Sequence, residues 1–191
     1  MAGSLVLLVV AGLFVRSLRN AQHVDLGFNP DHVLNVRMDT RHAGYNRQRT
    51  IDFYRELERR VRAIPGVESA SLAFSVPLGY ISDGTIVYPE GKPVMPGEQP
   101  TTIGYNPVDE AYFTTMQIPL VRGRGFTEND TEAAPPVVVI NQTMAARLWP
   151  NQEPIGRRVR LRTPGARPLE VVGVARDSKY LAVFESPLNK P

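Results

Sequence analysis

The feature that most constrains this chain is an apolar, uncharged run at its N-terminus. No charged residue occurs from Ala2 to Val15, and Leu5–Val10 reads Leu-Val-Leu-Leu-Val-Val. These 14 residues would form a helix of roughly 21 Å, which is shorter than a bilayer hydrocarbon core of about 30 Å. The run therefore fits a signal peptide, a buried helix of a soluble core, or part of a transmembrane helix.

The flanking residues favour the third of these interpretations. A signal peptide carries basic residues before its apolar run, but Met1–Ser4 has none. Arg16 and Arg19 also occupy the place where a small-residue cleavage site is expected. A buried core helix remains possible at this length. We predict the C-terminal two-thirds of a transmembrane helix that begins upstream of this sequence.

The predicted membrane-embedded side chains are the large apolar residues of the run: Leu5, Val6, Leu7, Leu8, Val9, Val10, Leu13, Phe14 and Val15. Arg16 and Arg19 follow directly, and the positive-inside rule would place that flank in the cytoplasm. Large domains cross the membrane largely regardless of such charges, and long Arg side chains snorkel at either interface. Charge therefore does not decide the orientation.

The rest of the 191-residue chain has the composition of one globular domain, with 21% charged and 42% hydrophobic residues. An Asn29-Pro30 turn marks the end of a linker. The sequence thus divides into a partial transmembrane helix (1–19), a linker (20–32), a core domain (33–180) with a Pro/Gly-rich lobe (77–107), and a tail (181–191) that leads toward further membrane helices.

The first half of the core domain predicts a strand, a helix and a second strand. Apolar and polar residues alternate over Val33–Asp39, which is typical of a half-buried strand. Asn46 can cap a helix that runs to Ile64, with apolar residues spaced three and four apart from Ile51 onward. Pro65-Gly66 ends this helix, and Val67–Val76 follows as a strand. Together they predict a βαβ unit.

The second half predicts another such unit with additional strands. Val137–Ile140 is a continuous apolar strand, and Asn141 can cap the helix that contains Met144 and Leu148. The further predicted elements are strands at Thr85–Tyr88, Thr101–Tyr105 and Ile118–Arg122, a short helix from Asp109 to Met116, and a hairpin of Val159–Arg162 with Leu169–Ala175. The fold class is therefore α+β, with βαβ units, a mixed sheet and helices packed on one face.

Residue patterns for catalysis, cofactors and metals are missing from the sequence. There is no cysteine, and Thr85 stands where the lysine of a phosphate-binding loop would follow Gly79–Gly84. His23, His32 and His42 fall in the linker and a loop, without the carboxylates that support metal ligands. We predict no enzyme, no cofactor and no metal site.

Nucleic-acid binding is also not expected. The net charge is only +3, because 22 basic and 19 acidic residues are interspersed. The densest basic stretch is Arg157, Arg158, Arg160 and Arg162, which we interpret as arginines on the exposed face of a strand.

Nine stretches, in order and spacing, make the chain resemble the MacB-like periplasmic core domain of bacterial ABC permeases in the FtsX-like superfamily. Each stretch is weakly specific by itself, but the set covers nearly the whole chain from Leu5 to Tyr180. The type it most resembles is the large duplicated orphan permease. The stretches are Val24–Pro30, Phe53–Leu57, Pro65–Ala70, Tyr112–Leu120, Arg122–Phe126, Val139–Asn141, Leu148–Pro150, Pro154–Gly156 and Val171–Val174.

This resemblance implies a membrane helix, then an extracytoplasmic domain, then three further membrane helices, so the sequence is expected to be a fragment. It also implies a domain on the periplasmic or extracellular side of the bacterial inner membrane that couples cytoplasmic ATP hydrolysis to export or signalling. The implied partners are the lipid bilayer, an ABC ATPase subunit and a second permease half. An alternative function is a membrane-anchored sensor or binding module without a transport role.

Overall fold

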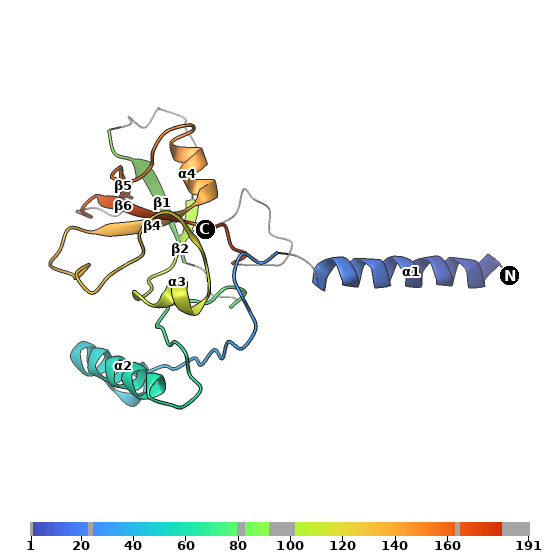
Figure 1. The fold of residues 1–191 in the computed structure, drawn as a ribbon, viewed down its shortest axis with the longest axis horizontal. Coiled ribbons are helices and arrows are strands. Elements are labelled where there is room, and N and C mark those ends of the chain that lie inside the picture. Colours follow the sequence, from blue (N-terminus) through green and yellow to red (C-terminus); the bar gives the residue numbers. More distant parts are fainter. Residues whose placement is uncertain (1, 23–24, 80–82, 92–101, 163–164, 181–191) are drawn as a thin grey trace.

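The structure is a computed structural model that describes residues 2–22, 25–79, 83–91, 102–162 and 165–180. Helix α1 (Ala2–Gln22) contains the apolar run and projects away from the remainder of the chain (Figure 1). Its large apolar side chains from Val6 to Leu18 face solvent, with Leu8 73% and Phe14 70% exposed. The side chain of Leu5 lies outside the described part of the structure. Over the described residues, no helix has both the length and the apolar character that a membrane crossing needs.

A six-stranded mixed sheet forms the centre of the globular part. Its strand order is β2-β1-β5-β6-β3, with β4 paired to β6. Among the described strands, β4 and β6 run parallel and the other pairs are antiparallel. The strands are β1 (Asp83–Pro89), β2 (Thr102–Tyr105), β3 (Leu120–Gly123), β4 (Val137–Asn141), β5 (Arg158–Leu161) and β6 (Leu169–Ala175).

The two edges of β6 have different partners. Glu170 lies opposite both β4 and β5, while Val174 and Ala175 lie opposite both β4 and β3. Since a strand has two edges, β5 and β3 share one edge of β6 and β4 occupies the other. Among the described strands, β2, β3 and β4 each pair with a single strand, so the sheet branches at β6.

Local sequence signals account for the helices. The Asn46 side chain accepts a hydrogen bond from the Arg49 amide (2.8 Å) and starts α2 (Arg47–Arg62), as predicted. The Asn141 side chain accepts one from the Met144 amide (2.8 Å) and starts α4 (Gln142–Leu148) in the same way. The remaining helical elements are the one-turn α3 (Tyr112–Thr115) and the 3-10 turn η1 (Arg41–Ala43).

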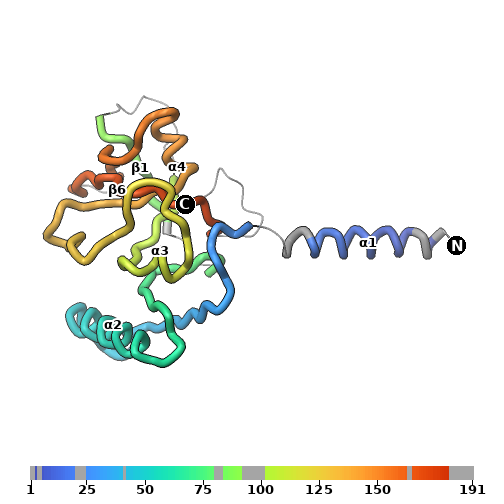
Figure 2. The backbone as a smooth tube through the Cα atoms, viewed as in Figure 1, coloured from blue at the N-terminus to red at the C-terminus, as the bar shows by residue number. Residues whose placement is uncertain are grey.

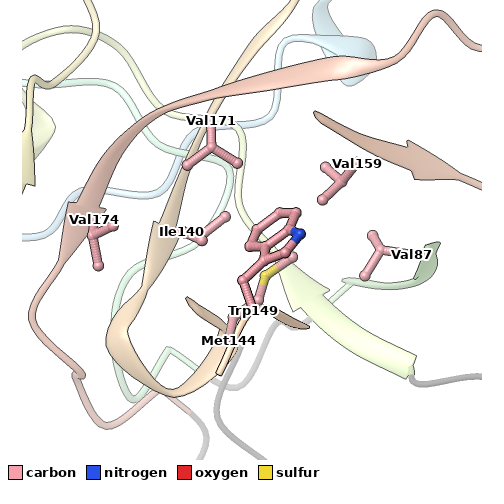
Figure 3. Close-up of a cluster of buried hydrophobic side chains, with 7 residues drawn as sticks. All are labelled: Val87, Ile140, Met144, Trp149, Val159, Val171 and Val174. Atoms are coloured by element: carbon pink, nitrogen blue, oxygen red, sulfur yellow. The ribbon is translucent and has the colours of Figure 1, made fainter. Parts of the chain in front are cut away.

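The main hydrophobic core lies between α4 and the sheet. The Trp149 indole, which follows α4, lies among side chains from β1, β4 and β5 (Figure 3). Val159 and Val171 are almost completely buried, at 1% and 0% exposed. The buried cluster consists of Val87, Ile140, Met144, Trp149, Val159, Val171 and Val174. Because Val87 belongs to it, the Pro/Gly-rich region 77–107 contributes to the core and is more than a peripheral lobe.

A second, smaller core occupies the opposite face of the sheet. Ala175 and Val139 pack with Tyr112, Met116 and Ile118 on and after α3. Their chain neighbours point into the first core, because successive side chains of a strand alternate between faces. The predicted placement of helices on one face is therefore wrong: α4 and α3 cover opposite faces.

The first predicted βαβ unit is also absent, although its helix is present. Val33–Asp39 is extended without strand partners, and Val67–Val76 contributes only an isolated bridge between Ala73 and Val108. Helix α2 has no fully buried residue, so its apolar face is only partly covered. A strand forms only when a neighbouring strand is available for hydrogen bonding, and the alternation of apolar and polar residues does not show whether one is.

These burial differences give a mutational prediction. Trp149→Ala should lower the free energy of unfolding by about 3–5 kcal/mol, because a large buried side chain is lost. Leu57→Ala, on the half-buried face of α2, should lower it by only about 1 kcal/mol. Urea unfolding of the full chain in detergent micelles, followed by circular dichroism, measures both. Equal effects would contradict this description of the core.

An ion pair near β3 gives a pH prediction. Asp130 accepts hydrogen bonds from Arg124 (2.7 and 2.9 Å) and from the Thr127 amide (2.8 Å). Arg124 above all holds the pKa of Asp130 at about 2, below its ordinary 3.8. A lowered folded-state pKa stabilises the fold above the unfolded pKa, and this contribution disappears as the pH falls toward 2.

Asp130→Asn should accordingly lower the melting temperature at neutral pH, and the difference from the wild type should shrink between about pH 4 and pH 2. Melting curves at several pH values measure this, with Glu128→Gln as the exposed neighbouring control. A difference that stays constant down to pH 2 would show that the Arg124–Asp130 pair does not contribute.

Candidate functional site

Two segments far apart in sequence run side by side where the chain enters and leaves the globular part. We call residues 25–29 and 176–180 together the junction. The Lys179 amide donates a hydrogen bond to the Leu26 carbonyl (2.8 Å), and Arg176 forms an ion pair with Asp25. The segment that follows α1 is thereby fastened to the segment that follows β6 (Figure 2).

Gly27 allows the two backbones of the junction to approach each other closely. It is buried and has φ +77°, in the left-handed region that favours glycine. A Cβ atom at this position would lie 2.0 Å from the Asp177 carbonyl oxygen and 2.7 Å from the Ser178 Cα. Only a residue without a side chain fits here, which explains the Leu26-Gly27-Phe28 sequence of the linker.

The chain after α3 holds both halves of the junction. The Asn29 amide donates to the Met116 carbonyl (3.1 Å), and the Asn29 side-chain amide donates to Gln117 Oε1 (3.0 Å). The Arg176 amide donates to the Pro119 carbonyl (2.8 Å). The two halves therefore share one support in addition to their direct contacts.

Asp177 links the junction to α4. Its carboxylate accepts hydrogen bonds from the Thr143 amide (3.0 Å) and the Thr143 hydroxyl (2.7 Å) in the first turn of that helix. Unsatisfied amides at a helix N-terminus are favourable partners for a carboxylate. The position of α4 and the path of the chain after β6 are thus connected directly.

Tyr180 ends the junction in a partly buried polar network. Its hydroxyl lies 2.8 Å from that of Tyr112, and Asn106 donates hydrogen bonds to the Tyr180 hydroxyl and to the Ser75 carbonyl (2.8 Å). The Leu78 amide donates to the Tyr180 carbonyl (2.8 Å). Burial raises the pKa of both tyrosines, so both hydroxyls stay neutral and act as hydrogen-bonding groups at physiological pH.

The junction is built to hold two chain segments at fixed positions. Its contacts are backbone hydrogen bonds, a close glycine contact, an ion pair and neutral hydroxyls. Such packed and hydrogen-bonded contacts transmit displacement, because protein interiors resist compression. Sequence patterns indicate the linker and the Tyr112 stretch but not their pairing with Asp177 or Tyr180. These contacts join residues that are up to about 150 positions apart, and no sequence pattern signals them.

The histidines and arginines that could bind a metal ion or a nucleic acid do not form a site in the described structure. His32 and His42 are exposed, and His23 lies outside the described residues. Within the described part of the chain, no three His, Cys, Asp or Glu side chains are placed to hold a metal ion. Arg158 and Arg160 are exposed around buried Val159, which confirms the interpretation of an exposed strand face, and Arg160 pairs with Glu90 at 2.9 Å.

Comparison with known proteins shows the family. The family model "MacB-like periplasmic core domain" matches residues 2–187. The chain therefore belongs to the MacB-like periplasmic core domain family, and the predicted resemblance is confirmed.

Relatives include a probable export ATP-binding/permease protein MacB of Pseudomonas entomophila, which is 31% identical over 144 residues (73% of this chain and 21% of that protein). The uncharacterized ABC transporter permease YvrN of Bacillus subtilis is 26% identical over 132 residues (67% and 29%). The solved periplasmic region of MacB from Actinobacillus actinomycetemcomitans has TM-score 0.46 and 22% identity, with 66% of this chain and 55% of that chain covered. The chain thus spans about a fifth to a third of the length of these curated permeases.

The close contact at Gly27 predicts a localised effect of substitution. Gly27→Ala should destabilise the fold clearly more than Gly44→Ala. Both glycines have positive φ, but nothing lies within 4 Å of a Cβ at position 44. Gly44→Ala should thus show only the conformational strain of about 1–2 kcal/mol. Thermal melting and amide exchange of Lys179 measure this, and equal losses would show that the junction does not constrain residue 27.

Proposed function

We propose that this chain is the extracytoplasmic domain of an ABC transporter permease in the bacterial inner membrane. In this role the domain couples ATP hydrolysis in the cytoplasm to export or signalling across the membrane, and it performs no bond chemistry itself. Membership of the MacB-like periplasmic core domain family supports the proposal. The observation that carries the coupling role is the junction, because it fastens the segment after α1 to the segment after β6.

The proposed membrane part is the apolar portion of α1, with the nine large apolar residues from Leu5 to Val15 in the lipid. Val6, Leu7 and Leu8 are 60%, 72% and 73% exposed, and such contiguous apolar surface is unfavourable in water. The following Arg16 and Arg19 would reach the lipid headgroups with their long side chains. The domain would then lie on the periplasmic or extracellular side.

The proposed partners follow from the same role. An ABC ATPase subunit or domain would supply the energy, and a second permease half would complete the transporter. When the membrane helices move, the junction would move as one unit with α4, through Asp177. It would also move with α3, through Tyr112, and with the chain before α3, through Asn106. The domain would therefore follow the membrane part as a rigid body.

A change of linker stiffness tests this coupling. Three glycines inserted after Val24 in the full-length permease should abolish export or signalling while ATP hydrolysis continues, because the linker no longer transmits displacement. The same insertion after exposed Gly165, between β5 and β6, is the matched control and should preserve both activities. Melting of each variant domain checks the fold.

Retained coupling after the Val24 insertion would refute the mechanical role. It would favour instead a membrane-anchored sensor or binding module, which needs no stiff linker.

A further inference from the structure

Helix α2 meets the centre of the domain through two carboxyl groups that hydrogen-bond to each other. Glu58 lies in the second half of α2, and Asp109 lies three residues before α3. Their side chains form a hydrogen bond, and we call these two residues the carboxyl pair. Two carboxylates cannot form such a bond, because both offer only acceptor oxygens. One of the two groups therefore carries a proton.

Asp109 is held firmly on the domain side of this contact. Its two carboxyl oxygens accept hydrogen bonds from the amides of Leu72 (2.5 Å) and Ala111 (3.1 Å). Its own amide donates to the Leu72 carbonyl (3.0 Å). Tyr112, three residues later, is buried in the second core. Amide donors favour the charged form of a carboxyl group, so Asp109 is the carboxylate of the pair and Glu58 carries the proton.

The surroundings of Glu58 favour its protonated form. Its side chain is only 17% exposed. Burial above all raises the pKa of Glu58; its ion-pair partner Arg62 opposes this effect, while Asp109 and Glu110 add to it. Burial also raises the pKa of Asp109, in spite of its two amide donors. The charged groups that face the pair are therefore Arg62 from α2 and Glu110 from the turn before α3, and the segment at Leu72 contributes its backbone amide.

The other contacts of α2 with the domain lie near the surface. The helix has no fully buried residue, and Figure 1 shows it at the periphery of the globular part. The Arg47–Glu132 ion pair is exposed on both sides, and such pairs contribute little to stability. Arg62 donates a hydrogen bond to the Ala70 carbonyl (3.1 Å) from a largely exposed position. The state of the carboxyl pair can therefore decide whether α2 stays in place.

We propose that Glu58 and Asp109 share one proton across this contact, and that loss of the proton as the pH rises releases α2 from the centre of the domain. The proton passes to water and leaves two carboxylates at hydrogen-bonding distance, where they repel each other in a partly desolvated position. Movement of α2 separates and hydrates them. Glu58 keeps its ion pair with Arg62 during this movement, because both residues belong to the helix.

The direction of the pH effect follows from proton linkage. A group whose pKa is raised by docking binds its proton more tightly in the docked state than in the released state. Docking is therefore fully favoured below the ordinary carboxyl pKa values of 4.5 and 3.8, and it weakens as the pH rises through the raised values. The proposal concerns the conformations of this chain and does not depend on the transport role.

Glu58→Gln tests the shared proton. The glutamine amide can donate a hydrogen bond to Asp109 at every pH, so α2 should stay docked. Glu56→Gln is the matched control, since it makes the same change of charge on the same helix. Arg59 and Arg60 hold the pKa of Glu56 at about 2, so this residue does not titrate in the relevant pH range.

Amide hydrogen exchange of the full chain in detergent micelles measures the release. A released 16-residue helix is only marginally stable in water, so its amides lose protection. Relative to an unstructured chain at the same pH, protection of α2 should fall at least about 10-fold between about pH 5 and about pH 8 in the wild type and in Glu56→Gln. It should stay constant in Glu58→Gln, and protection of β6 should stay constant in all three proteins.

Three results of this experiment would overturn the proposal. The first is protection of α2 that does not change with pH in the wild type. The second is a Glu58→Gln variant that keeps the pH response, or a Glu56→Gln variant that loses it. The third is a parallel loss of protection in β6, which would show unfolding of the whole domain instead of release of α2.

Spin-label distances test the wild-type carboxyl pair without relying on Glu58→Gln. The sequence has no cysteine, so labels can be placed through Arg55→Cys on α2 and Ala146→Cys on α4, both at exposed positions. Pulsed electron paramagnetic resonance should give a narrow distance distribution at about pH 5 and a broad one at about pH 8. Identical distributions at the two pH values would show that α2 stays docked, and they would overturn the proposal.

Discussion

The pairing of β6 with three other strands is the interaction on which the rest of the structure depends. Val171–Ala175 is buried throughout, with β4 along one edge and β5 and β3 along the other. Gly173 makes this crowding possible, since a Cβ there would lie 2.1 Å from the Arg124 carbonyl oxygen. Because both cores lie against β6, a disturbance of this strand reaches both faces of the sheet.

The same strand connects the core to the junction. Arg176 and Asp177 follow β6 directly, so the sheet fixes their positions. Through their contacts they in turn position Asp25, Gly27 and the first turn of α4. Exposed ion pairs such as Arg176–Asp25 contribute little stability by themselves. The precision of the junction comes instead from backbone hydrogen bonds and from the close glycine contact, which tolerate little displacement.

The periphery is much less constrained than this centre. Exposed ion pairs of Glu56 with Arg59 and Arg60, at 2.7 Å, lie within α2 and stabilise the helix itself. Its contacts to the rest of the domain include partial packing and the exposed Arg47–Glu132 ion pair. The extended segment Val33–Asp39 between the junction and α2 lies outside the sheet. We therefore expect the sheet around β6 to behave as a rigid unit, and helix α2 to change position more easily.

The sequence by itself determined the elements whose hydrogen bonds are local. Helices α2 and α4 start at the predicted caps Asn46 and Asn141, and β4, β5 and β6 occupy the predicted segments. The motif order also identified the family correctly. A helix bonds residues four apart, so caps and periodicity are visible in a short stretch of sequence.

Only the tertiary structure decided which segments pair. It left Val33–Asp39 outside the sheet, placed α3 and α4 on opposite faces, and brought Tyr180 to Tyr112. Strand pairing, face assignment and buried polar contacts all join distant residues. Their free energies depend on which partner is available and how well it packs, and alternation within a single strand carries no information about the partner.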